Sequence, residues 1–397
     1  MISTNSIIEP VSVDWIERPF EYLRRKDGQS FDDTIVRNWY IARAFVLEKL
    51  EDVAFRPDEN RHLHVIVADD TPLMLSVIRQ VALLAHFFNF DNKERQLFRN
   101  SSVITIVSNN PGIRGELDKE EYLCNLPKYC KVVERNNNIN ADILNLDLEI
   151  HIVDDESNID NESDSIRVVF SERDILDFCE YKKAKGEDIF SIDTRKSFYT
   201  ENVYNLGEEI DNIPAEDIHC AERYSLALNF FQNHIFKKPF KKLVDDDVWN
   251  KRNNQCVVKE KISNIFCSDC FKSRWLGIHN CCDGDSKQER WLWGKYIEAL
   301  SMSEHARWVV EKLIMGYSPL NAKQRFLDES LAYDNDLRKA YRKQLKRNPV
   351  DPVHIDLCSY ADVRRIDPDN LKYDSFLVLA IPKILEKVRI EDTGGLL

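Results

Sequence analysis

The chain has 397 residues, a formal net charge of −13 and 43% hydrophobic residues. This length predicts two or three domains, and the composition is that of a globular rather than a disordered protein. The negative charge repels a phosphate backbone, so general nucleic-acid binding is excluded unless basic residues segregate on one patch. The strongest basic run, at residues 338–347, is better explained as a solvated face of a helix.

The first ten residues lack the basic start and apolar middle of a signal peptide, and no window holds the roughly 18 apolar residues that cross a bilayer as a helix. The ten cysteines show no framework spacing, which favours reduced thiols. We therefore expect a soluble cytoplasmic protein.

Residues 1–60 form the first predicted unit, an N-terminal helical segment. Apolar residues recur at helical spacing between 34 and 50. A β-branched run at 63–68 follows and predicts a buried parallel strand. Thr71 then suits a helix cap and Pro72 the first turn of a helix that we expect to end near Phe88.

The second predicted unit is a doubly wound Rossmann-like domain at 61–213. After the first strand and helix, strands are expected at 102–108 and 148–153, because strand, helix and strand at this spacing indicate a βαβ unit. Asn-rich and acidic segments predict loops at 136–138 and 154–164, and two further strands are predicted at 165–170 and 188–193.

The turn after the first strand lacks the features of a dinucleotide site. Residues 68–74 contain no glycine, and Asp69 and Asp70 would repel a pyrophosphate at the start of the helix. The second strand leads into Ser108 and Asn109, where an NAD-binding unit has an acidic residue for the ribose. We therefore expect a sheet that has lost its cofactor, with retained NAD binding or another polar ligand near Asn109 as the alternatives.

Residues 214–299 form a predicted helical connecting region, with helical patterns at 216–236 and from 289 to 314. This region includes cysteine and histidine residues at short spacing, which raises a zinc site as one interpretation. The preferred interpretation is buried reduced thiols, because Cys267 and Cys270 are one helical turn apart and free cysteine is comfortable in a core. The zinc alternative would use Cys267, Cys270, His279 and Cys281.

The last predicted unit covers 300–397. Ser301 and Glu304 have the spacing of a capping box and predict a helix start, and Gly316 suits a left-handed helix end. A charged segment at 321–352 has helical periodicity and is interpreted as a helical insertion, suited to serve as a lid or a partner surface.

The same region resembles the ryanodine receptor (RyR) repeat domain, which also occurs in bacterial proteins unrelated to calcium channels. The residues that carry the resemblance are Glu304-His305-Ala306-Arg307-Trp308, Gly316-Tyr317, His354, Lys372-Tyr373-Asp374 and Ile381-Pro382. Two departures are Tyr317 in place of the usual Trp, and Ile355-Asp356-Leu357-Cys358 in place of Pro-Cys-Leu-Val. The preceding half is similar to the NAD-binding-type Rossmann domain of potassium-uptake regulators, a combination that is frequent in such proteins.

The resemblance implies a small groove between two helix-plus-strand halves of the C-terminal domain. Arg307 offers a fork of donors for phosphate or carboxylate, and Trp308 or Tyr317 offers a ring on which a base stacks. Each of these residues also has a structural interpretation, as core aromatic, structural histidine or helix cap. The expected ligand-binding residues are His305, Arg307, Trp308, Tyr317, His354 and Asp374.

Three hypotheses about function follow. The leading one is a ligand-binding sensor or regulator that recognises a small nucleotide-derived molecule and takes part in bacterial antiviral or stress signalling, as the resemblance implies. The second is an enzyme that processes NAD or a nucleotide with Asp69, Asp70 and Asn109. The third is an interaction scaffold that forms a homo-oligomer or binds a protein partner through the helical insertion. No nucleophile with a neighbouring base stands out, so catalysis is not the favoured interpretation.

Overall fold

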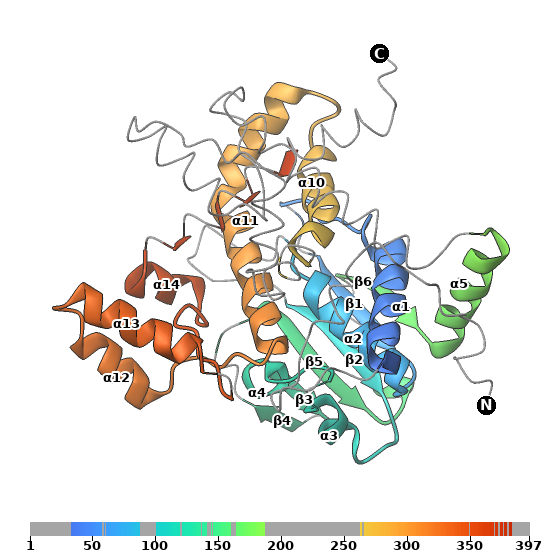
Figure 1. The fold of residues 1–397 in the computed structure, drawn as a ribbon. Coiled ribbons are helices and arrows are strands. Elements are labelled where there is room, and N and C mark those ends of the chain that lie inside the picture. The colour runs from blue at the N-terminus through green and yellow to red at the C-terminus, as the bar shows by residue number, and fades with distance from the viewer. Residues whose placement is uncertain are drawn as a thin grey trace.

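A computed structural model describes most residues between 33 and 186 and between 263 and 382, which form a six-stranded sheet and a set of helices (Figure 1). The predicted strand at 188–193 and the predicted helix at 216–236 lie outside the described residues. The described residues are 33–57, 59, 61–87, 101–119, 121–135, 137–140, 144, 146–159, 164–186, 263, 266–348, 350–368, 370, 371, 374, 375, 377, 378, 381 and 382.

The sheet is mostly parallel, in the order β4-β3-β5-β2-β1-β6. β1 pairs in parallel with both β2 and β6, β5 pairs in parallel with β2 and β3, and only the edge strand β4 is antiparallel to its neighbour. The strands are β1 (His62–Val67), β2 (Ser102–Val107), β3 (Lys131–Glu134), β4 (Asn137–Asn140), β5 (Leu148–Val153) and β6 (Ser165–Phe170).

Four of the strands confirm the sequence predictions, because β1, β2, β5 and β6 coincide with the apolar β-branched runs. One loop prediction is wrong. Asn137 and Asn138 were expected in a loop, but they lie in β4 and pair with Glu134 and Val133 of β3. Asparagine is uncommon in strands, yet β4 is an edge strand whose side chains are largely exposed, so its polar residues cost little there.

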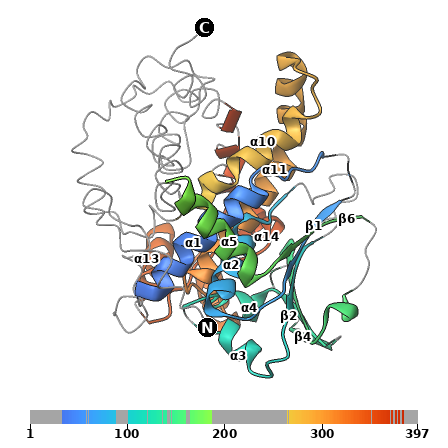
Figure 2. The same ribbon diagram turned by 90° about the vertical axis from the view of Figure 1, so that its right-hand side faces the viewer.

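Helices α1 (Asp33–Leu50), α2 (Pro72–Leu84) and α5 (Glu172–Ala184) lie against one face of the sheet (Figure 2). The amide of Met74 donates to Thr71 Oγ1 at 3.4 Å, which confirms the predicted cap of α2. Smaller elements complete this half of the chain. They are α3 (Ile113–Leu117), α4 (Leu126–Tyr129) and the short 3₁₀ helix η3 (Glu156–Asn158).

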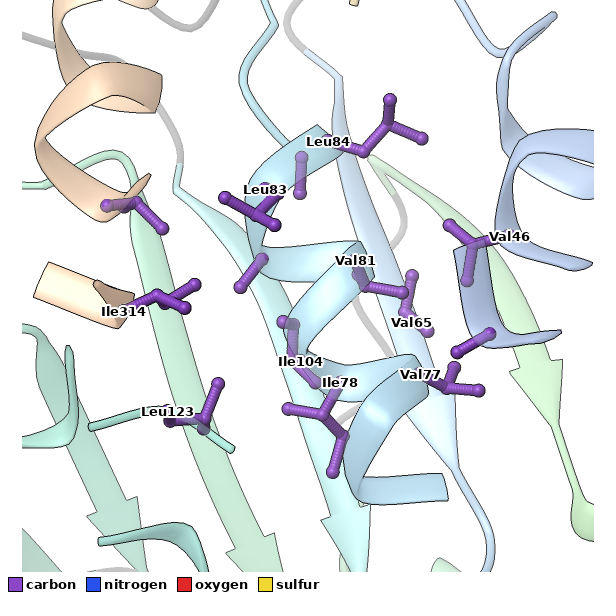
Figure 3. Packing of buried hydrophobic residues seen from close by; sticks show 14 of the residues in the cluster. Val46, Val65, Val77, Ile78, Val81, Leu83, Leu84, Ile104, Leu123 and Ile314 are labelled. Atoms are coloured by element: carbon purple, nitrogen blue, oxygen red, sulfur yellow. The ribbon is translucent and has the colours of Figure 1, made fainter. Parts of the chain in front are cut away.

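Helix α2 is buried along almost its whole length, because it is covered by α1, the sheet and the end of a C-terminal helix. Val77, Ile78 and Val81 of α2 point among Val46 of α1 and residues of β1 and β2, and Ile314 reaches the same core (Figure 3). Burial of side chains of this kind contributes about 1.5–3 kcal/mol each. The C-terminal region and the sheet therefore share one hydrophobic core.

The C-terminal region is helical, as predicted. Helix α11 (Ser286–Ile314) is the longest element, and it follows α10 (Phe271–His279). The predicted insertion consists of α12 (Ala322–Ser330) and α13 (Asn335–Lys346), and α14 (Tyr360–Ile366) comes after it. Within the described residues, none of the helices combines the length and the apolar character that a membrane span needs.

The predicted helix start at Ser301 is wrong. Ser301 lies in the interior of α11, and its hydroxyl donates to the carbonyl of Ile297 one turn earlier. The helix begins instead at Ser286, where the side chain of Asp285 accepts from the amides of Lys287 and Gln288. A Ser-x-x-Glu pattern thus occurs here inside a helix, and the expected domain boundary at residue 300 falls within α11.

The end of α11 is as predicted. Gly316 has a φ of 86°, in the left-handed region that favours glycine. The amide of Gly316 bonds to the carbonyl of Leu313, and the amide of Tyr317 bonds to that of Lys312. This is a Schellman motif, which turns the chain sharply and holds Tyr317 against the last turn of the helix.

Candidate functional site

Four ring side chains from separate segments form a cluster beside the C-terminal half of α11. The rings of His305 and Trp308 stack with centroids 5.9 Å apart. The ring of His354 meets that of Trp308 edge to face at 4.9 Å and that of Tyr317 at 6.2 Å. Trp308 and His354 are half-buried, whereas His305 and Tyr317 are buried. The structure therefore brings four predicted site residues together, and Trp308 and His354 are the two that reach the surface.

Asp374, a fifth predicted residue, joins this ring cluster through His305. Asp374 Oδ2 lies 3.4 Å from His305 Nδ1, and His305 Nε2 lies 3.0 Å from the carbonyl oxygen of Cys358. Burial by itself lowers the pKa of His305, but the hydrogen bond and the charge of Asp374 outweigh it, and the pKa is raised. Both ring nitrogens face acceptors, which favours the imidazolium form. His305 and Asp374 therefore support the cluster from inside.

Asp356 also belongs to the ring cluster, although the sequence pattern does not single it out. Its Oδ2 accepts from Asn370 Nδ2 at 2.8 Å and lies 3.7 Å from His354 Nδ1. Its Oδ1 is buried without a hydrogen-bond partner among the described residues. Burial, reinforced by the charge of Asp367, raises the pKa of Asp356 to about 6. The only sequence signal is an acid two residues after His354.

Positive charge surrounds the exposed side of the ring cluster. Burial lowers the pKa of His354 well below its usual value, and the charges of Lys346 and Lys312 lower it further, so this ring is neutral. Lys312 Nζ lies 5.7 Å from the centroid of the Trp308 ring and bonds to Glu311 Oε1 at 2.6 Å. The half-buried Trp308 ring thus carries an ammonium group over it and a neutral imidazole at its edge.

Arg307, expected as the best ligand contact, does not belong to the ring cluster. It is 1% exposed, and its guanidinium donates to both carboxylate oxygens of Glu304 and to Glu311 Oε2 at 2.7 Å. Every donor nitrogen is used by a carboxylate on the same helix. Arg307 is therefore a structural residue in this arrangement, because no donor is left to face a ligand.

Glu304 is the centre of this ionic cluster, which we define as Arg274, Glu304, Arg307, Glu311 and Lys312. Its carboxylate accepts from Arg274 of α10 as well as from Arg307, and the thiol of Cys267 lies 3.3 Å from it. Burial by itself raises the pKa of Glu304, but the two guanidinium charges lower it to about 2. Glu304 is therefore an ionised, fully paired buried carboxylate rather than a helix cap.

A second buried ion pair connects the sheet half to the C-terminal helices. Arg43 of α1 donates from Nε and Nη2 to the two carboxylate oxygens of Asp269, at 2.9 and 2.8 Å. Gln80 of α2 donates to the same carboxylate at 3.1 Å. Bidentate geometry of this kind fixes orientation as well as distance. The relative position of α1, α2 and the segment before α10 is therefore set by directional bonds inside the shared core.

The carboxyl ends of β1 and β2 hold the residues of the enzyme hypothesis. Asp69 Oδ2 accepts from the amide of Glu172 at 2.7 Å, and Asp70 Oδ2 accepts from Ser108 Oγ at 2.5 Å. Asn109 is exposed beside them. Both carboxylates tie neighbouring strand ends together, as expected at the ligand-binding edge of a parallel sheet that presents no glycine turn.

The cysteines of the zinc hypothesis contact other groups. Cys267 faces Glu304, the thiol of Cys270 points to the carbonyl of Leu83, and the thiol of Cys281 points to the carbonyl of Gly277. His279 bonds to Glu289. Within the described part of the chain, no three His, Cys, Asp or Glu side chains converge as metal ligands would. Cys267 and Cys270 are buried, as the thiol interpretation predicts.

No protein-family model, no curated protein and no solved structure matches the chain. The residues and their geometry are therefore the basis for any assignment of function.

Proposed function

We propose that this protein is a ligand-binding regulator that recognises a small nucleotide-derived molecule at the ring cluster of its C-terminal region. The proposal includes the RyR-type character of that region and the signalling role that the resemblance implies. The observation that carries it is the environment of Trp308. A half-buried indole has the Lys312 ammonium over its face and the neutral ring of His354 at its edge.

This environment matches the two parts of a nucleotide. A base stacks on an aromatic side chain with a gain of about 1–3 kcal/mol, whatever its sequence identity. A phosphate is attracted by the positive charges of Lys312 and Lys346, which already act on His354. The rings of the cluster touch one another, so the ligand lies on the outer surface of Trp308 rather than between the rings.

The sheet half is a scaffold in this proposal. The turn after β1 has no glycine, and the carboxylates of Asp69 and Asp70 occupy the place of a pyrophosphate while they bond to neighbouring strand ends. The shared core and the Arg43–Asp269 pair then connect the scaffold rigidly to the ligand-binding region.

Calorimetric titration with nucleotides, cyclic nucleotides, ADP-ribose and NAD tests the proposal. Trp308→Ala should weaken the binding of the recognised compound by roughly 5- to 150-fold, the equivalent of one lost stacking contact. Trp291→Ala is the matched control, because Trp291 lies on the same helix but is 61% exposed and distant in sequence from the cluster. The control should leave affinity unchanged.

The same titrations separate the competing hypotheses. If binding or turnover is lost on Asp70→Ala and kept on Trp308→Ala, the site is the sheet edge and the proposal is wrong. A folded protein that binds none of these compounds would also contradict it. Circular dichroism of each variant shows whether lost binding reflects lost structure.

A further inference from the structure

The hairpin formed by α12 and α13 has its polar side chains inside and its apolar side chains outside. Asp328 is 1% exposed, and it accepts from Arg338 and from Arg342 across the two helices. Arg342 also bonds to Asp367 near α14, which anchors the hairpin to the rest of the molecule. None of the side chains of α13 is buried. The hairpin is thus held by ion pairs and not by an apolar core.

The apolar side chains face solvent instead. Phe326 is 73% exposed and Tyr333 is 82% exposed, and Leu327 and Leu337 are also exposed. These four side chains lie in the second half of α12, the turn and the first turn of α13. Figure 1 shows α12 and α13 at one edge of the molecule, away from the sheet. A rigid helix pair with an outward apolar side is suited to an interface, and aromatic residues are typical of its centre.

The exposed charges of the hairpin are divided between its two ends. Glu329 in the last turn of α12 and Asp336 in the first turn of α13 make the tip acidic. Lys323 in the first turn of α12, with Lys343 and Arg347 at the end of α13, make the base basic. Two such hairpins laid side by side in opposite directions would place each acidic tip against a basic base.

We propose that this hairpin is the dimer interface, and that its partner is the same hairpin of a second copy of the chain. A two-fold axis between two copies makes the contact antiparallel and self-complementary, which is the commonest symmetry of homo-oligomers. The two hairpins then form a four-helix bundle in which Phe326, Leu327, Tyr333 and Leu337 of both copies build the core. Tip-to-base charge pairs fix the direction of packing.

A second copy fits better than an unrelated acidic partner. An acidic surface would be attracted to the basic base but repelled by Glu329 and Asp336 at the tip, where the apolar side chains are. Only a partner with the same division of charge and a matching apolar side satisfies both ends. The second copy has these properties by construction, and it is present at the concentration of the protein itself.

Sedimentation equilibrium of the full chain over a wide concentration range tests the proposal. The wild type should show a monomer–dimer equilibrium. Phe326→Asp should raise the dissociation constant on the order of 30-fold or more, because it removes a central aromatic contact. Its side chain is already exposed in the monomer, so the fold should be kept. A wild type that stays monomeric throughout, or a dimer that Phe326→Asp leaves intact, would overturn the proposal.

Charge reversal gives a second and independent test. Glu329→Lys with Asp336→Lys, and separately Lys343→Glu with Arg347→Glu, should each weaken the dimer. The chain that carries all four changes should dimerise again, because tip and base are complementary once more. Lys287→Glu with Arg290→Glu is the control, since it makes the same change in net charge on exposed residues of α11. Failure of the four-fold variant to recover would contradict the antiparallel arrangement.

Discussion

Helix α11 presents two neighbouring faces that use similar residue types in opposite ways. Glu304, Arg307 and Glu311 are fully buried in ion pairs, and none of the guanidinium nitrogens of Arg307 lacks an acceptor. His305 and Trp308 begin one residue later, about 100° around the helix. Their face carries rings that are partly exposed and histidines with opposite pKa shifts. A charged side chain on the first face is structural, whereas the second face keeps an accessible surface for a ligand.

This contrast shows that residue type is a poor guide to ligand contact within one helix. Arginine is the best anion binder by chemistry, yet here two glutamates on its own helix satisfy it completely. Tryptophan is typically core, yet Trp308 reaches the surface. The decision rests on which side of α11 faces α10 and the sheet half.

The largest expected effect comes from breaking the ionic face. Glu304→Ala should lower the free energy of unfolding by about 3–5 kcal/mol, because it leaves Arg274 and Arg307 buried with too few negative partners. Urea unfolding followed by tryptophan fluorescence measures the change. Glu298→Ala on the same helix is the control, since Glu298 is exposed, and it should cost less than about 1 kcal/mol. Similar losses for both variants would show that the ionic face is not structural.

A smaller effect of opposite sign is expected on the ring face. The pKa of Asp356 is raised to about 6 from a usual value of 3.8. The folded protein therefore holds the proton more tightly than the unfolded chain, and stability falls as pH rises between these values. Asp356→Asn removes this loss and should stabilise the protein at neutral pH by roughly 2 kcal/mol.

Unfolding free energies measured from pH 4 to pH 7 test this expectation. The difference between Asp356→Asn and wild type should grow with pH across that range and then level off. The exposed Asp118→Asn serves as the comparison variant and should run parallel to wild type. A pH-independent difference would mean that the Asp356 carboxyl is not protonated in the fold near pH 4–6.

The smallest expected effect concerns the support of the rings. Asp374→Asn removes the charge that raises the pKa of His305, so that pKa should fall. The His305 contribution is present below its usual pKa and is lost as pH rises through the raised value, so the variant should lose about 1 kcal/mol in mildly acidic solution only. Nuclear magnetic resonance titration of His305 measures the pKa directly. An unchanged pKa would exclude the Asp374 contact as its cause.

Much of the local structure could be predicted from the sequence. The β-branched runs gave β1, β2, β5 and β6, Thr71 gave the cap of α2, and Gly316 gave the end of α11, because each depends on residues within one or two turns. The same local signals failed at Ser301, whose capping pattern lies inside a longer helix, and at Asn137, whose polarity is tolerated on an edge strand.

The candidate site was predicted only in part. Proximity of His305, Trp308, Tyr317 and His354 followed from the resemblance and is now visible in the ring contacts. The role of Arg307 and the presence of Asp356 were not predictable, because each depends on the orientation of α11 and on the contacts of its own side chain. The ligand itself stays a prediction until the titrations are made.

The sequence by itself determined the acidic charge, the strand and helix segments and the residue types available for binding, since these depend on composition and short-range pattern. The tertiary structure decided which charges are buried and which rings are exposed. Asp328 illustrates the reason. Nothing in its neighbours announces a buried carboxylate, and only the fold of α12 against α13 places Arg338 and Arg342 around it and turns Phe326 outward. Partners distant along the chain are selected by packing, which no local pattern encodes.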